Sequence, residues 1–136
     1  YTSTIPSLLV KGMIVAIKSS KAKKVLVTNI MSKWGQTNGF KASDFARELE
    51  KYLHSKLEAV IVNTQTPPPQ ALRHYQKEKA KFVEADVPAL KNLKMQVIAK
   101  PLLGRNTFVK NHADALARSF LRHDSDKLAR VIYDML

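Results

Sequence analysis

The chain has 136 residues, of which 45% are apolar and none is cysteine, and its formal net charge is +12. This length and composition fit one globular domain with one core, and the missing cysteines exclude disulfides, thiolate nucleophiles and thiolate metal sites. There is no run of about 18 apolar residues and no signal-peptide pattern, so we expect a cytoplasmic protein without a membrane span.

The first forty residues contain a predicted helix, a strand and a loop. Pro6 suits the first turn of a helix, and apolar residues on every side of this segment predict that the helix is buried nearly all round. A β-branched run at 24–30 is typical of a strand covered on both faces. A polar loop follows, punctuated by Gly35 and Gly39.

The next helix is expected to begin near Ser43, a candidate N-cap, with Asp44 in its first turn. Its apolar stripe consists of Phe45, Leu49, Tyr52 and Leu53. Residues 59–63 (AVIVN) read as a second buried strand. The prolines at 67–69 favour a rigid connector and a helix start.

The last third of the chain is expected to hold two strands and a helix. A short strand is predicted at 81–86 and another at 95–103, while 104–118 reads as a loop or a short helix. From Asp124 onward the spacing predicts a helix. Its apolar face consists of Leu128, Val131, Ile132 and Met135.

Strands alternating with helices predict an α/β fold with a mostly parallel sheet and flanking helices. In such sheets ligands bind beyond the carboxyl ends of the strands. Residues 29–40, residues 63–69 and the segment after Leu103 therefore lie on the expected ligand side. A lysine cluster at 18–24 (KSSKAKK) precedes a strand, so we expect it at the opposite end.

The loop after the first strand carries groups suited to a phosphate or a sugar. The Asn29 amide can read a ring edge or a hydroxyl, and Thr37 offers a hydroxyl. Backbone amides around Gly39, with the start of the following helix, can approach a phosphate. The spacing matches neither a dinucleotide fingerprint nor a Walker loop, so an ordinary connecting loop remains the alternative. Asn63 likewise either reads a ligand or ties down its own loop.

Two further candidates lie later in the chain. Tyr75 sits in an amphipathic helix, either in the core or against a ligand. Arg122 and His123 precede a helix that Asp124 or Ser125 can cap. An arginine beside a helix N-terminus suits a diphosphate, whereas the alternative is a capped helix with a surface arginine. The histidines show no metal-ligand spacing, and no nucleophile or metal site is indicated.

Four blocks, in order along the chain, resemble the CofD-like family, which contains bacterial gluconeogenesis factor and 2-phospho-L-lactate transferase. The blocks are YTSTIPSLLVKGM, VLVTNIMSKWGQTNGF, VIVNTQTPPPQALRHYQKEKAKFVEAD and LRHDSDKLARVI. The second resembles the family's Asn-x-Met strand end and G-E-T-D-G-Y loop, and the last its RHD-x-x-K-[LV]-A signature. The pattern is more similar to the gluconeogenesis-factor branch.

The resemblance implies a modified Rossmann-like fold that binds UDP-sugars such as UDP-N-acetylglucosamine, without a cofactor. It also implies a role in cell-wall and cell-shape maintenance during gluconeogenic growth. No reaction is established for that branch, so we expect binding without turnover. The alternative is a transferase that moves a phospholactyl group from a guanosine diphosphate conjugate. Carried over by motif, the expected ligand-binding residues are Tyr75 and Arg122, with Thr2, Ser3, Asn29, Thr37 and Gly39 lining the same cleft.

The sequence departs from the family pattern at several positions. Gln36 and Asn38 stand where the family has carboxylates, which removes charge and weakens any metal or general-base role. Phe40 replaces a tyrosine, and the stretch before Arg122 is longer, with NHADALAR as extra material.

The resemblance also implies that residues 1–136 form one α/β unit, the C-terminal half of a CofD-like domain without its N-terminal glycine-rich nucleotide loop. We therefore expect three partners: a UDP-sugar, the missing N-terminal half, and further copies of the chain. Nucleic acid binding through KSSKAKK is a weaker alternative, because the cluster has no aromatic residue for base stacking.

Overall fold

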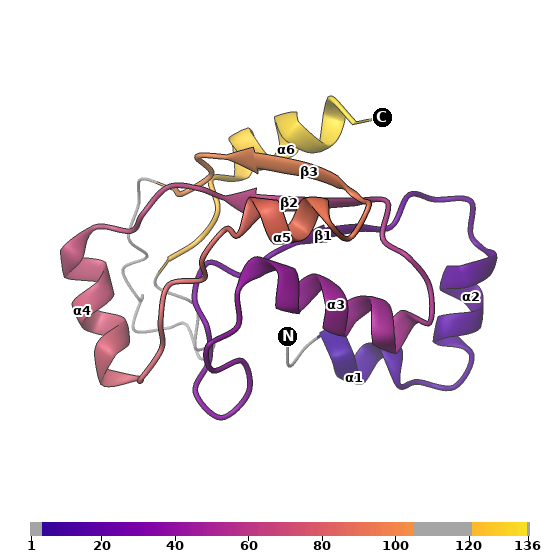
Figure 1. Cartoon of the computed structure of the whole chain (residues 1–136), viewed down its shortest axis with the longest axis horizontal. Helices are drawn as coiled ribbons and strands as arrows, with labels where there is room; N and C mark the ends of the chain where they lie inside the picture. The colour runs from indigo at the N-terminus through magenta and orange to yellow at the C-terminus, as the bar shows by residue number, and fades with distance from the viewer. Residues whose placement is uncertain (1–3, 105–120, 136) are drawn as a thin grey trace, which may run out of the picture.

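The computed structural model describes residues 4–104 and 121–135, and it contains a three-stranded sheet. Strands β1 (Val25–Val27), β2 (Ala59–Asn63) and β3 (Gln96–Lys100) lie in the order β1-β2-β3, and all pair in parallel (Figure 1). The register places Ala59 between Val25 and Gln96. The predicted α/β fold with a parallel sheet is confirmed.

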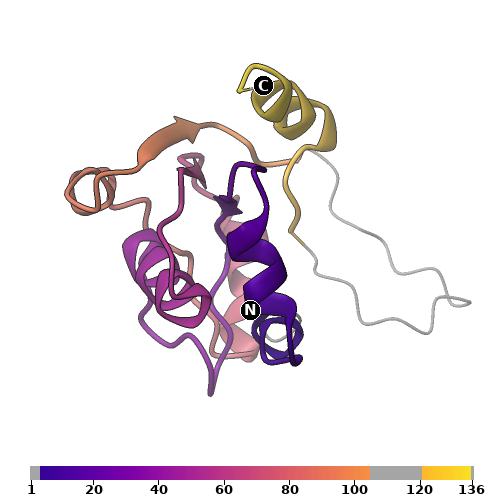
Figure 2. The same ribbon diagram turned by 90° about the vertical axis from the view of Figure 1, so that its right-hand side faces the viewer.

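Helices cover the two faces of this sheet unequally. Helices α1 (Thr4–Leu8), α2 (Met13–Ser19), α3 (Ala42–Leu53) and α5 (Val87–Lys91) lie on one face, and α6 (Ser125–Tyr133) lies on the other (Figures 1 and 2). Helix α4 (Pro69–Lys77) lies beyond the carboxyl ends of the strands (Figure 1). It begins at the prolines, as predicted.

The main core fills the space between the sheet and the first group of helices. Every residue of β2 is buried, because this strand has a neighbour on each side and both of its faces are covered. From α3, Phe45 and Leu53 are buried, and Leu49 and Tyr52 are partly buried against them. The predicted apolar stripe of α3 is therefore confirmed. Burying one such side chain contributes about 1.5–3 kcal/mol.

A second, smaller cluster lies at the carboxyl end of the sheet. It joins residues that follow each of the three strands: Ile30, Ala71, Tyr75, Ala80, Leu103 and Leu121. Met31 and Phe82 pack against them. The segments that follow β1, β2 and β3 are therefore packed against one another on the expected ligand side of the sheet.

The prediction of one helix buried nearly all round after Pro6 is wrong. The segment is broken into α1 and α2 by Gly12, whose φ of 86° lies in the left-handed region that glycine tolerates. Nothing in the described part of the chain covers the outer side of these helices. Leu9 and Val10 are exposed, and Val15 is 71% exposed. Strand β1 is also only half-buried, contrary to expectation.

The predicted strand at 81–86 is not a strand of the sheet. Phe82 instead makes an isolated antiparallel bridge to Met31, and the Val83 amide donates to the Ile30 carbonyl at 2.9 Å. The β-prone residues of this segment therefore pair with the loop after β1, beside the small cluster. The predicted strand at 95–103 is confirmed in shorter form as β3. No described helix has the length and apolarity needed to cross a membrane.

Candidate functional site at the carboxyl edge of the sheet

The Arg-His-Asp segment is fixed beside the end of β3. The Gly104 amide donates to the Arg122 carbonyl at 2.9 Å, and the Asp124 amide donates to the Leu102 carbonyl at 2.7 Å. Leu103 and His123 form an antiparallel bridge between these bonds. A Cβ at Gly104 would lie 3.2 Å from the Arg122 carbonyl oxygen, a contact so tight that this backbone would have to shift by a few tenths of an ångström.

Tyr75 is joined to the same segment. Its hydroxyl accepts a hydrogen bond from the Leu121 amide at 2.9 Å, and its ring lies buried in the small cluster. The structure therefore brings together Tyr75 and Arg122, the two residues that the family resemblance singled out. The Tyr75 hydroxyl thereby holds the backbone next to Arg122.

The start of α6 is capped as predicted. The Asp124 Oδ1 accepts from the Asp126 and Lys127 amides, each at 3.1 Å. These two helix amides therefore already have a hydrogen-bond acceptor. The Arg122 side chain, which is exposed, is therefore the cationic group with which this segment can meet a phosphate.

His123 lies between these two residues, and its Nε2 is buried without a hydrogen-bond partner. Burial lowers the pKa of His123 below its usual value of 6.5, because a partly desolvated imidazole disfavours the charged form. Near neutral pH this ring therefore adds no charge beside Arg122.

The loop after β1 places its candidate residues differently. Thr37 is fully buried, and its Oγ1 accepts from the Lys33 amide at 2.8 Å within the loop's own turn. A direct contact of this hydroxyl with a ligand requires the turn to open. Gly39 is exposed with a φ of 72°, and the Asn29 side chain is exposed just beyond β1.

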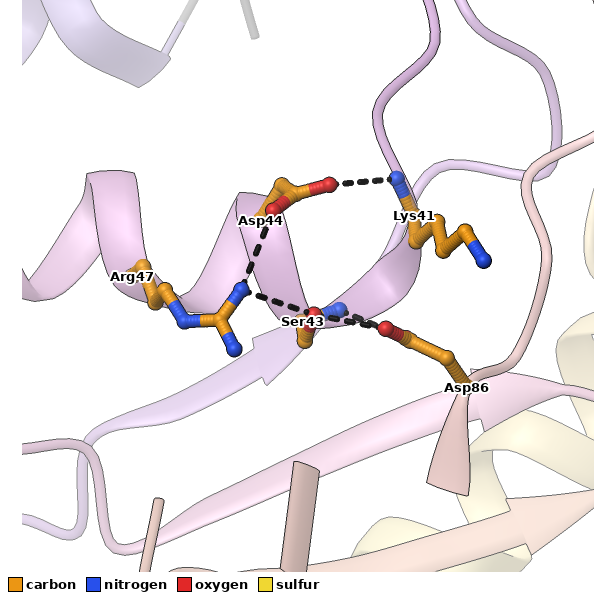
Figure 3. Close-up of polar contacts among 5 residues, drawn as sticks. All are labelled: Lys41, Ser43, Asp44, Arg47 and Asp86. Atoms are coloured by element: carbon orange, nitrogen blue, oxygen red, sulfur yellow. Dashed lines mark hydrogen bonds and ion pairs between the residues drawn. The ribbon is translucent and has the colours of Figure 1, made fainter. Parts of the chain in front are cut away.

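The start of α3 is not available to a phosphate, contrary to expectation. Asp86, from the segment before α5, accepts from the Ser43 amide at 2.9 Å and from the Ser43 hydroxyl at 2.6 Å (Figure 3). The Ala42 amide donates to the Glu84 carbonyl, and Asp44 accepts from the Lys41 amide. Ser43 lies inside α3, so its predicted role as N-cap is wrong.

Further polar contacts tie this helix start together. Arg47 Nη1 donates to the Ser43 hydroxyl and to Asp44, each at 3.1 Å (Figure 3). Glu84 lies 2.9 Å from Lys41 Nζ and raises the pKa of that lysine. The sequence pattern missed Asp86, because an aspartate beside a valine and a proline is typical of a cap for its own helix. No short-range signal links it to Ser43.

Asn63 ties down its own loop, the structural alternative of the two. Its Oδ1 accepts from the Leu102 amide at 2.9 Å and from the Gln65 amide at 3.1 Å, and its Nδ2 donates to the Gln65 carbonyl. The ends of β2 and β3 are thereby held in one arrangement.

The lysine cluster lies at the other end of the sheet, as predicted. The Lys24 amide and Nζ donate to Glu58 at 2.6 and 2.9 Å, which lowers the pKa of Glu58. Lys23 Nζ donates to the Met135 carbonyl. Lys23 and Lys24 therefore link the start of β1 to the end of α6 and to the start of β2.

Two predicted site residues, Thr2 and Ser3, lie outside the described residues, as does the NHADALAR stretch. Within residues 4–104 and 121–135, no group of three or more His, Asp or Glu side chains is arranged to hold a metal ion.

The chain is similar to known proteins of one family. A family model described as 2-phospho-L-lactate transferase CofD matches residues 1–103. Two relatives carry the term gluconeogenesis factor in their names. One, from Thermotoga maritima, is 42% identical over 132 residues, which cover 97% of this chain and 40% of the relative. The other, from Bacillus subtilis, is 30% identical over 137 residues, covering all of this chain and 40% of the relative.

A crystal structure of a UPF0052-family protein from Bacillus halodurans has the same fold. It superposes with a TM-score of 0.80 at 28% identity, over 95% of this chain and 38% of that one. The chain thus spans about 40% of the length of the curated relatives it matches. The resemblance stated from the four sequence blocks is confirmed.

Proposed function

Because the chain belongs to the 2-phospho-L-lactate transferase CofD family, we propose that it forms the diphosphate-holding part of a nucleotide-sugar binding protein. The proposed ligand is a UDP-sugar, with UDP-N-acetylglucosamine as the first candidate. The observation that carries this proposal is the pairing of residues 121–124 with 102–104, because it presents Arg122 beyond the carboxyl ends of the strands. Ligands of α/β sheets bind there.

In this proposal Arg122 donates charge-assisted hydrogen bonds to the diphosphate. Tyr75 fixes the backbone at Leu121 and thereby the direction of the arginine. Asn29 and Gly39 line the cleft from the loop after β1, and Thr2 and Ser3 line it from the start of the chain. Thr37 holds that loop in shape through its bond to the Lys33 amide.

The proposed role is regulatory, in cell-wall and cell-shape maintenance during gluconeogenic growth in the cytoplasm. Two observations support binding without turnover. The loop after β1 has the amides Gln36 and Asn38 where the family has carboxylates, and the sequence carries no recognisable nucleophile motif. The regulatory role is further supported by the Bacillus subtilis relative named gluconeogenesis factor, because that similarity covers all of this chain.

The second candidate is a phospholactyl-type transferase acting on a nucleoside diphosphate conjugate. The description of the matching family model favours it. Transfer of this kind rests on positioning and electrostatics, so it does not require a nucleophilic side chain.

Calorimetric titration of the full-length protein with UDP-N-acetylglucosamine and with GDP separates the two candidates. Tight binding of the UDP-sugar with weak binding of GDP is the result we expect. A preference for GDP, with release of guanosine monophosphate from a phospholactyl conjugate, would replace the regulatory role by the transferase. Binding of neither ligand would refute both.

We further propose that the rest of the full-length protein packs on α1, α2 and the outer edge of β1. Helices α1 and α2 lie on the same face of the sheet as α3 (Figure 1). Since crossovers between parallel strands are right-handed, a strand preceding α1 belongs beside β1, on the side away from β2. Leu9, Val10 and Val15 are exposed in and between these helices. Exposed apolar residues of this kind support a packed partner on this face.

A substitution on this face of the full-length protein tests the arrangement. Val15→Lys should lower its melting temperature, because a covered valine would be replaced by a charge. Tyr133→Lys on α6, at a residue exposed to a similar extent, should change it little. Equal melting temperatures for Val15→Lys and the wild type would show that the face stays open. Concentration-dependent self-association, lost in Val15→Lys, would assign it to a second copy of the chain.

A further inference from the structure

We propose that the Trp34 indole is a stacking surface for the nucleobase of the ligand that Arg122 binds. This inference rests on the proposed nucleotide-sugar site and adds a residue that recognises the base. Trp34 lies in the loop after β1, at the carboxyl edge of the sheet where that site is placed.

The first observation is the exposure of the ring. Trp34 is 57% exposed, although it is the only tryptophan of the chain and its largest aromatic side chain. Tryptophan combines a large apolar face with one N–H donor, which is why exposed tryptophans anchor ligands and partners. The loop places this apolar surface at the sheet edge where ligands of α/β folds bind.

The second observation is that the turn carrying Trp34 is fixed. The Gln36 and Thr37 amides donate to the Lys33 carbonyl at 3.1 and 2.9 Å, and the Lys33 amide donates back to the buried Thr37 hydroxyl at 2.8 Å. The backbone that carries the ring is therefore already ordered before a ligand binds, which lowers the entropy cost of binding there.

The residues that lead into this turn are fixed as well. The Ser32 amide donates to the Lys81 carbonyl at 2.7 Å, and the Lys81 amide donates to the Ser32 hydroxyl at 2.9 Å. These bonds attach the loop after β1 to the segment that follows α4, so the backbone that leads to Trp34 is held relative to that helix.

The third observation links Trp34 to the arginine. Lys79 Nζ lies 5.0 Å from the centroid of the Trp34 ring. Lys79 follows Tyr75 by four residues, about one helical turn, just past the end of α4. Tyr75 in turn bonds to the Leu121 amide, next to Arg122. The carboxyl end of α4 and the residues just after it thus contact both the Trp34 ring, through Lys79, and the backbone beside Arg122, through Tyr75.

This arrangement fits a nucleotide better than a free sugar phosphate. A base has a π face that stacks on an indole, and its phosphates are anionic. The cation–π contact of Lys79 holds the ring and keeps a positive charge beside it. We therefore place the base at Trp34 and the diphosphate at Arg122.

The test measures dissociation constants of the full-length protein for UDP and for UDP-N-acetylglucosamine. Trp34→Ala should weaken both by about tenfold, because base–aromatic stacking has this magnitude. Trp34→Phe, which keeps an aromatic face, should retain most of the affinity. Tyr133→Ala, at an exposed aromatic on α6, serves as the matched control and should change neither constant.

Three results would overturn the inference, and they differ from one another. Wild-type affinity of Trp34→Ala for both ligands would show that the indole is not in contact. Weaker binding of UDP-N-acetylglucosamine with unchanged binding of UDP would assign the ring to the sugar instead of the base. Absence of binding in the wild type itself would refute the proposed nucleotide site on which the inference rests.

Discussion

Replacement of Tyr75 by phenylalanine tests how the Arg-His-Asp segment is held. The ring stays in the small cluster, so its packing is kept, and the Leu121 amide loses its acceptor at 2.9 Å. A buried amide left without a partner costs about 1–3 kcal/mol. In a protein of the relatives' length, of which this chain is 40%, this corresponds to a fall in melting temperature of roughly 1–4 °C.

Two assays follow this change. Urea denaturation of the full-length protein gives the free energy of unfolding of Tyr75→Phe, and amide exchange gives the protection of residues 121–123. Both should fall, whereas Tyr133→Phe, at an exposed tyrosine, should change neither. A free energy of unfolding within about 0.5 kcal/mol of the wild type, with unchanged exchange, would refute the role assigned to the Tyr75 hydroxyl.

Three further predictions concern the supports of the site. Asp86→Ala should lose about 1–3 kcal/mol in urea denaturation, because Ser43 loses two hydrogen bonds to a carboxylate; Asp86→Asn, which keeps one acceptor, should lose less, and equal stability of all three proteins would contradict this. Gly104→Ala should raise the dissociation constant for the UDP-sugar and lower the melting temperature only slightly, since its Cβ meets the Arg122 carbonyl oxygen at 3.2 Å; an unchanged dissociation constant would contradict this prediction. Burial lowers the pKa of His123, so the unfolded state binds more protons below about pH 6.5. The stability from neutral His123 is complete above that pH and is lost as the pH falls through the lower folded-state pKa. Urea midpoints at pH 8 and pH 5.5 should therefore differ less in His123→Gln than in the wild type, and the same difference in both would count against the buried neutral ring.

The sequence predicted the parallel sheet and the long elements well. Strand β2 and helix α3 follow from a continuous apolar run and from a stripe at helical spacing. The cap of α6 by Asp124 was also predicted, because it depends on neighbours in the sequence alone. These features are local, and the physics that sets them is contained in a window of about ten residues.

The features that sequence analysis missed depend on distant contacts. Asp86 supports α3 from 43 residues away, and the 81–86 segment pairs with the loop after β1 instead of joining the sheet. Helix α2 has apolar residues that predict burial, yet their burial requires a surface beyond the described chain.

The candidate site shows the same division. The motif identified Tyr75 and Arg122, but only the fold shows that the Tyr75 hydroxyl contacts the backbone at Leu121. Thr37 was predicted from the same loop motif to line a cleft, and its side chain is enclosed by the loop's own turn. Type and spacing of residues indicate which positions matter, while the direction of a side chain depends on tertiary packing.

The affinity of Arg122→Ala for UDP-N-acetylglucosamine tests the central claim most directly. Calorimetric titration of the full-length protein should show a dissociation constant at least about tenfold above that of the wild type, because charge-assisted hydrogen bonds to the diphosphate are lost. Arg130→Ala, which removes an exposed arginine in the last turn of α6, should leave the constant unchanged. Equal affinities of the wild type and Arg122→Ala would contradict the claim that this segment holds the diphosphate.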